Sequence, residues 1–151
     1  LLAAALHMGA ILGNASPEDR KNIYDFGEKL GLAFQIEDDY LDTFGDQKTF
    51  GKRIGGDILQ SKKTYLLCLS LSKANEAQRR EIFRVFDEKN EEKKIRGMKA
   101  IYEQLNVHKD TFAIMEKFYD EALESLGALS IDRKQSNRLY ELAEAVYKRS
   151  F

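Results

Sequence analysis

Apolar residues recur at intervals of three and four along most of this 151-residue chain. The clearest example follows Pro17, where one helical face carries four large apolar side chains: Ile23, Phe26, Leu30 and Phe34. This spacing is typical of a helix that buries one side. No stretch alternates apolar and polar residues over the length of a strand. The pattern therefore predicts an all-α protein of about six or seven helices.

The first long helix has recognisable ends. Ser16 directly before Pro17 indicates an N-cap followed by proline at the first helical position. The apolar pattern continues to about Phe44 and stops at a glycine. Gly27 and Gly31 lie on the apolar side of this helix, where glycine lowers helix propensity. We expect these two glycines to allow another helix to approach closely.

After the first long helix, the sequence predicts one loop followed by five further amphipathic stretches. The segment GDQKTFGKRIGGD, residues 45–57, contains four glycines and lacks a helical period, so we expect a loop. Helical spacing returns in five later stretches: 62–74, 77–88, 91–105, 110–129 and 132–150. No repeat or linker separates them. The sequence therefore predicts one domain spanning residues 1–151.

Composition places the chain among ordinary globular proteins. Hydrophobic residues make up 43% and charged residues 32%, which is too apolar for disorder. The net charge of −1 indicates neither a nucleic-acid partner nor an anionic membrane surface. No apolar run approaches the roughly 20 residues of a membrane-spanning helix. The single cysteine, Cys68, is predicted to be a buried packing thiol, and a cytoplasmic location is expected.

The start of the chain predicts that it belongs to a longer protein. The opening LLAAALHMGAIL is helical in pattern from its first residue, without an initiator methionine or an N-cap. A secretory signal fits poorly, because no basic region or clear cleavage site is present. We therefore expect further chain before Leu1.

Four polar residues stand out near the end of the first long helix: Gln35, Asp38, Asp39 and Asp42. At about 100° per residue they share a wedge of roughly 100° on the helix surface. Like charges one turn apart repel, and the helix dipole is already negative at this end. Acids on an otherwise apolar helix need a compensating cation. Hard oxygen ligands without histidine or cysteine favour magnesium or calcium over zinc.

The acids alone leave two interpretations open. They could cap a solvated helix end and pair with Lys48, Lys52 or Arg53 of the next loop, or they could bind a metal. The basic residues that continue to Lys62 and Lys63, together with the loop glycines, favour the second interpretation. Magnesium in proteins commonly uses a few carboxylates plus substrate phosphates. The spacing matches neither a P-loop nor an EF-hand, so we predict a metal–diphosphate site.

One segment of the sequence resembles a known family. GLAFQIEDDYLDTFGD, followed by FGKRIGGDILQSKKTYL, is similar to the second aspartate-rich region of trans-prenyl diphosphate synthases, the farnesyl and geranylgeranyl diphosphate synthase group. The specific combination is FQxxDDxxD, then GK, then GD with a lysine five residues later. It implies an all-α helical bundle of the isoprenoid synthase type. Because the family's first DDxxD is absent, the chain would be the C-terminal portion of that bundle.

The resemblance implies roles for the acids by position. Asp38, Asp39 and Asp42 resemble the second DDxxD, which binds Mg²⁺ bridged to an allylic diphosphate. Asp38, Gln35 and Lys52 are the residues expected to act in catalysis.

The resemblance also implies contacts with the substrate. Gln35 and Phe34 are similar to the glutamine and the aromatic residue near the ionising carbon. Lys52 and Lys62 match lysines that hold the diphosphate. Asp57 matches the acid of the GD pair, which supports the site indirectly.

The implied reaction condenses an allylic diphosphate with isopentenyl diphosphate to a longer trans-prenyl diphosphate. The intact enzyme would be a magnesium-dependent homodimer without nucleic-acid partners or stable membrane insertion, and this chain alone would be inactive. Two alternatives remain open: a class I terpenoid cyclase with the same ionisation chemistry, or a catalytically inactive helical binding subunit. The resemblance implies that product length is set near the first DDxxD, which this sequence does not contain.

Overall fold

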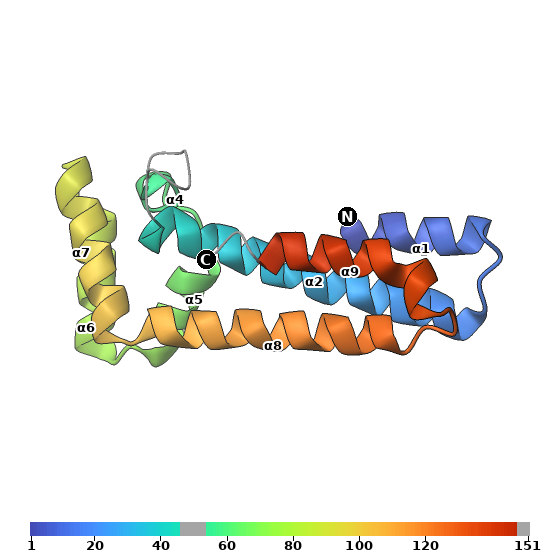
Figure 1. Cartoon of the computed structure of the whole chain (residues 1–151). Helices are drawn as coiled ribbons and strands as arrows, with labels where there is room; N and C mark the ends of the chain where they lie inside the picture. The colour runs from blue at the N-terminus through green and yellow to red at the C-terminus, as the bar shows by residue number, and fades with distance from the viewer. Residues whose placement is uncertain (46–53, 148–151) are drawn as a thin grey trace. The chain divides into compact units, whose positions relative to one another are not determined.

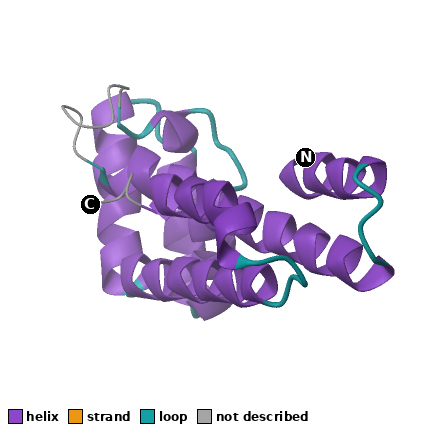
Figure 2. Cartoon of the chain, turned by 45° about the vertical axis from the view of Figure 1, so that its right-hand side comes forward, coloured by secondary structure: helices purple, strands orange, loops and turns teal. Residues whose placement is uncertain are grey.

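In a computed structural model, the chain folds into helices joined by short loops (Figure 1). The structure describes residues 1–45 and 54–147, and within these ranges it contains no strand (Figure 2). Eight helices lie there: α1 (Leu2–Leu12), α2 (Pro17–Phe44), α4 (Gly56–Leu59), α5 (Tyr65–Lys73), α6 (Glu76–Phe86), α7 (Glu91–Gln104), α8 (Val107–Gly127) and α9 (Arg133–Tyr147). None of these helices combines the length and apolar character needed to cross a bilayer. The predicted all-α class is confirmed, and α4 is one short turn that begins within the last two residues of the segment predicted as a loop.

Side-chain caps define where several helices begin. Ser16 Oγ accepts the N–H of Asp19 at 3.0 Å, which confirms the predicted N-cap of α2. Asn75 and Gln78 form a reciprocal capping box at the start of α6. At the start of α7, the side-chain oxygen of Asn90 accepts the N–H of Lys93. These polar residues therefore determine helix boundaries through local hydrogen bonds.

Packing divides the chain into two compact units. The first comprises Leu1–Gln35 with Ile114–Phe151, and the second comprises Ile36–Ala113. Helices α2 and α8 contribute residues to both units. A single domain over residues 1–151 stays a prediction.

The core of the first unit lies between α2, α8 and α9, which run alongside one another (Figure 1). All three helices contribute buried side chains to this core: Ile23, Phe26, Leu30, Ala122, Leu126 and Ala143. Three of the four residues predicted to form the apolar face of α2 are thus buried. Phe34 is the exception, with 39% of its surface exposed, and its predicted burial is wrong. Spacing shows which side chains share a face, whereas neighbouring helices decide how much of that face is covered.

The core of the second unit gathers around α7. Met98 is fully buried, and the other buried members come from α4 to α8: Ile58, Leu66, Leu67, Ala74, Ile82, Val85, Ile101, Tyr102, Leu105 and Val107. Cys68 is exposed, so its predicted burial is wrong. In α5 the buried side is formed by Leu66, Leu67 and Ser70. Helical geometry turns Cys68 away from that side despite its apolar neighbours in sequence.

Asp19 links α2 to the loop between α8 and α9. Its Oδ1 accepts the Ser130 N–H at 2.7 Å, and its Oδ2 accepts hydrogen bonds from the Ser130 and Ser16 hydroxyl groups. These bonds, above all the one from the Ser130 side chain, lower the pKa of Asp19. A lowered carboxyl pKa stabilises the fold above the unfolded value near 3.9. That stabilisation is lost as the pH falls through the lower folded-state pKa.

Asp19→Asn is therefore expected to lower the melting temperature at neutral pH, because a neutral amide is a weaker acceptor for the three donors. The difference in melting temperature between Asp19→Asn and the unmodified chain should decrease as the pH falls below about 3.9. Thermal melts at a series of pH values check this, with Glu28→Gln as a control, since Glu28 is an exposed acid of the same helix. A difference that is independent of pH would contradict the proposed role of the Asp19 charge.

Candidate active site

The predicted acids lie in the last turns of α2, within the second unit. Asp39 is buried, with 8% of its surface exposed, and Asp38 and Asp42 are partly buried. Ile36 and Leu41 on the same turns are buried as well. Carboxylates in such surroundings need hydrogen-bond donors or a cation.

Asp42 joins the end of α2 to the start of α4. Its Oδ2 accepts the backbone N–H of Asp57 at 2.9 Å, and its carbonyl oxygen accepts the N–H of Gly55 at 2.6 Å. A Cβ atom on Gly56 would lie 3.1 Å from Asp42 Oδ1. Glycine therefore lets the backbone approach this carboxylate closely.

The described neighbours of Asp42 shift its pKa in opposite directions. Burial is the main influence and raises its pKa, and the nearby charge of Asp57 raises it further. The N–H groups of Asp57 and Gly56 and the positive charge of Lys62 act in the opposite direction. Because the pKa of Asp42 remains raised, an additional cation beside this carboxylate would be stabilised.

Asp39 is attached to a different element. Its Oδ2 accepts the N–H of Tyr65, the first residue of α5, at 3.0 Å. The first N–H groups of a helix lack partners within the helix and favour a negative charge. Asp39 therefore stabilises the start of α5, a contact that the sequence did not predict.

Lys62 brings a positive charge to this group of acids. Its ammonium forms an ion pair with Asp57 Oδ1, and its backbone N–H donates to the Asp57 carbonyl at 3.0 Å. The bond to Asp57 raises the pKa of Lys62, and the charges of Asp57, Asp42 and Asp39 add to this effect. The side chain is 53% exposed, so a solvent-borne anion can reach it. Lys62 and Asp57 were both predicted for the site, and the structure brings them together with Asp42.

A group of aromatic rings lies at the end of α2. The Phe44 ring is 5.2 Å from that of Tyr40, 6.4 Å from that of Tyr102 and 6.0 Å from that of His108. Lys99 Nζ lies 5.6 Å from the centre of the Phe44 ring. Burial raises the pKa of Tyr102, whose hydroxyl is bonded to Thr64. These contacts around Phe44 were not predicted, although the helical spacing of residues 95–102 indicates the face of α7 that carries Lys99 and Tyr102.

The geometry of the acids bears on the predicted metal site. Within residues 1–45 and 54–147, no group of three His, Cys, Asp or Glu side chains is arranged to hold a metal ion by itself. Asp39 and Asp42 each direct one carboxylate oxygen to a backbone N–H. Their donor chemistry nevertheless fits magnesium, which commonly takes one or two carboxylates together with phosphate oxygens and water. Metal binding by Asp38, Asp39 and Asp42 stays a prediction.

Other predicted residues lie outside the second unit or outside the described residues. Lys52 lies outside the described residues, as do Lys48 and Arg53. Gln35 and Phe34 are exposed residues of α2 and belong to the first unit. Their contacts with substrate stay predictions.

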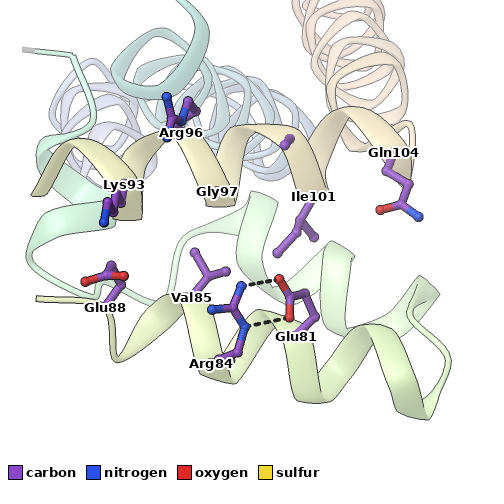
Figure 3. A pocket seen from close by; sticks show the side chains of 10 residues that line it. Glu81, Arg84, Val85, Glu88, Lys93, Arg96, Gly97, Ile101 and Gln104 are labelled. Atoms are coloured by element: carbon purple, nitrogen blue, oxygen red, sulfur yellow. Dashed lines mark hydrogen bonds and ion pairs between the residues drawn. The ribbon is translucent and has the colours of Figure 1, made fainter. Parts of the chain in front are cut away.

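A separate hollow of about 680 Å³ lies between α6 and α7 (Figure 3). Arg84 donates to both carboxylate oxygens of Glu81 at its edge, at 2.6 and 2.8 Å. Val85 and Ile101 line its apolar part. It contains none of the residues predicted for the site, so the acidic end of α2 remains the candidate active site.

Comparison with known proteins identifies the family. A model of the polyprenyl synthetase family matches residues 1–105. The chain belongs to the polyprenyl synthetase family. The matched residues of this family member include the acids of α2 together with α4 and α5.

Named relatives agree with this assignment. The chain is 41% identical over 85 residues to a short chain isoprenyl diphosphate synthase of Methanothermobacter thermautotrophicus, covering 56% of this chain and 26% of the relative. It is 34% identical over 148 residues to farnesyl pyrophosphate synthase of Rattus norvegicus, covering 98% of this chain and 40% of the relative. A geranylgeranyl pyrophosphate synthase structure matches with a TM-score of 0.85 and 35% identity, covering 99% of this chain and 47% of that one. The predicted all-α isoprenoid synthase fold is confirmed, and this chain spans less than half the length of each relative named here.

Proposed function

We propose that this chain forms part of a trans-prenyl diphosphate synthase that joins an allylic diphosphate to isopentenyl diphosphate. One observation carries the proposal: Asp42, Asp57 and Lys62 are linked to one another at the acidic end of α2. The raised pKa of Asp42 favours a further cation there, and the exposed Lys62 ammonium favours an anion. A magnesium diphosphate combines these two charges. The names of the relatives support the same class of reaction.

Ionisation of an allylic diphosphate requires neutralisation of the charge that develops on the leaving group. Asp38, Asp39 and Asp42 would hold Mg²⁺, which would supply part of that charge together with phosphate oxygens and water. Lys62 and Lys52 donate hydrogen bonds to the diphosphate oxygens. Acids and lysines thus act on the same leaving group from this portion of the enzyme.

The other site residues orient groups around the reacting carbon. Asp57 holds the Lys62 ammonium through their ion pair. Phe34 and Gln35, one turn before the acids, face the allylic cation with an aromatic ring and an amide oxygen. The double bond of isopentenyl diphosphate then attacks the cation, and the released diphosphate takes the proton lost in the last step.

The proposal includes Mg²⁺ as cofactor, a homodimer as the intact assembly and the cytoplasm as location. Nucleic acid is not among the proposed partners, since the net charge of the chain is −1. Stable insertion into a membrane is not proposed either.

Two other functions make different demands on the same residues. A class I terpenoid cyclase would ionise an allylic diphosphate without a second diphosphate substrate. A helical binding subunit would need neither metal nor lysine. The matched relatives are prenyl diphosphate synthases by name, which favours condensation over both.

The test compares the full-length product of the gene with the chain of residues 1–151. Each is incubated with Mg²⁺, an allylic diphosphate and isotopically labelled isopentenyl diphosphate. The full-length protein is expected to form a longer prenyl diphosphate only when both substrates and Mg²⁺ are present. The chain alone is expected to form none, because it supplies a single acid-rich segment to the leaving group.

Other outcomes would select the alternatives. Release of a hydrocarbon without isopentenyl diphosphate would indicate a cyclase. Absence of any turnover by the full-length protein would indicate a binding subunit. Metal-dependent product from residues 1–151 alone would contradict the division of the site between this segment and the rest of the enzyme.

A further inference from the structure

Lys94 of α7 is a buried lysine, with 7% of its surface exposed, although the adjacent Lys93 is exposed. Its Nζ donates to Ser61 Oγ at 2.9 Å and lies 5.0 Å from the centre of the Phe86 ring. Removing an ammonium group from water is unfavourable unless other groups compensate it. The hydroxyl and the ring supply this compensation, so Lys94 is directed to a defined partner and not to solvent.

Ser61, the partner of Lys94, is the turning residue between α4 and Lys62. Its φ of 56° lies in the left-handed region, which is disfavoured for a residue with a Cβ atom. The Ser61 N–H donates to the Ile58 carbonyl at 3.1 Å, and the next N–H, that of Lys62, donates to the Asp57 carbonyl at 3.0 Å. A disfavoured conformation persists only when surrounding contacts hold it. The hydrogen bond from Lys94 is one such contact, and it acts one residue before Lys62.

The other end of α4 is also held by α7. Gly55 has a φ of 85°, and a Cβ atom there would lie 2.8 Å from both Cδ1 and Cγ1 of Ile95. Ile95 thus packs directly on the backbone that leads into Asp57. Two consecutive residues of α7, Lys94 and Ile95, therefore contact the two ends of α4.

Helix α7 packs closely against α6. A Cβ atom on Gly97 would lie 2.7 Å from Cγ1 of Val85, so the two helices meet closely at this glycine. Figure 3 shows Gly97 and Val85 facing each other across the two helices. This close contact gives α7 a packing partner on the side of Gly97, while Lys94 and Ile95 of the same helix contact the ends of α4.

We propose that Lys94 is a positioning residue for Lys62: by holding Ser61 in its left-handed turn, it keeps the Lys62 ammonium beside Asp57 and near the diphosphate. This inference rests on the proposed function, in which Lys62 binds the diphosphate. Lys94 itself is buried and acts only through the turn.

The test uses the full-length protein and measures Mg²⁺-dependent binding of inorganic pyrophosphate by calorimetry, with a thermal melt of each variant. Lys94→Met keeps the apolar stem and removes the ammonium, and Lys93→Met is the matched control on the exposed side of α7. Lys94→Met is expected to weaken pyrophosphate binding about tenfold, since a hydrogen bond from a charged donor is lost. Lys93→Met is expected to bind pyrophosphate like the unmodified protein.

A double-mutant comparison separates positioning from a general structural effect. If Lys94 acts through Lys62, then Lys94→Met should add little to the loss caused by Lys62→Met. An equal further loss in the Lys62→Met background would overturn the inference. Unchanged binding by Lys94→Met alone would overturn it as well, and would leave the proposed function intact. Unchanged binding by Lys62→Met would instead contradict the proposed role of Lys62, and with it this inference.

Ser61→Ala provides the same test if Lys94→Met does not fold. It removes the acceptor hydroxyl from an exposed turn and leaves the buried lysine in place. Weaker pyrophosphate binding that depends on the presence of Lys62 is again expected. Binding equal to that of the unmodified protein would overturn the inference.

Discussion

Replacing Asp38 by alanine in the proposed full-length enzyme is expected to lower kcat by about a hundredfold. In the proposed mechanism Asp38 binds the magnesium that neutralises the leaving diphosphate. Such a metal contributes several kcal/mol to the transition state, and a loss of about 3 kcal/mol corresponds to about a hundredfold in rate. Steady-state kinetics at saturating Mg²⁺ with both diphosphate substrates measures the effect. The melting temperature should change little, because Asp38 is only partly buried.

Two further variants make this prediction specific. Glu28→Ala removes an exposed acid from the same helix and is expected to keep the normal rate. Asp39→Ala is expected to reduce stability by about 1–3 kcal/mol, since the Tyr65 N–H loses its acceptor. If Asp38→Ala and Asp42→Ala both retain near-normal rates, the acidic end of α2 is structural and the metal assignment is wrong.

Gly27→Ala is expected to destabilise the first unit by about 1–3 kcal/mol, the usual range for overpacking. A Cβ atom at this position would lie 2.7 Å from Ala3 Cα and 2.9 Å from Ala3 N. These are backbone atoms of α1, so no change of side-chain rotamer can relieve the contact. The predicted close approach of another helix at Gly27 is therefore confirmed. Thermal or chemical denaturation of the purified chain measures the loss.

Gly31→Ala is the matched control, one turn further along the same helix. A Cβ atom there meets only Leu2 Cβ, at 4.0 Å. Alanine should therefore be neutral or stabilise the helix by up to about 1 kcal/mol through its higher propensity. Equal losses of stability in Gly27→Ala and Gly31→Ala would show that the contact of residue 27 with Ala3 does not limit packing. The tight approach predicted at Gly31 is wrong, because the residue of α1 that faces it stands further away.

The helices themselves could be predicted because their causes are local. Ser16 and the spacing of Ile23, Phe26 and Leu30 indicated where α2 begins and which side it buries. The short helix α4 was missed, since four residues that begin at the second of two glycines carry no usable period. Exposure was misjudged for Phe34 and Cys68 because each was judged from its neighbours in sequence.

Part of the chemistry of the candidate site could also be predicted from the sequence. The residue types at Asp42 and Lys62 indicated a site for a cation and an anion, and the family resemblance added Asp57. The structure brings these three together. The contact of Asp39 with Tyr65 and that of Lys94 with Ser61 were not predictable. Each joins residues of different helices, and nothing in the sequence around either partner specifies the other.

By itself the sequence determined the helical class, the main helix boundaries and the acidic segment with its lysines, since these depend on spacing, caps and residue chemistry within a few turns. The tertiary structure decided which carboxylate oxygens accept backbone hydrogen bonds and which residues of α7 hold the turn before Lys62. It also decided which glycine of α2 meets α1. The physical reason is that burial and hydrogen bonding between elements depend on how whole helices pack, and helical spacing describes only one helix at a time.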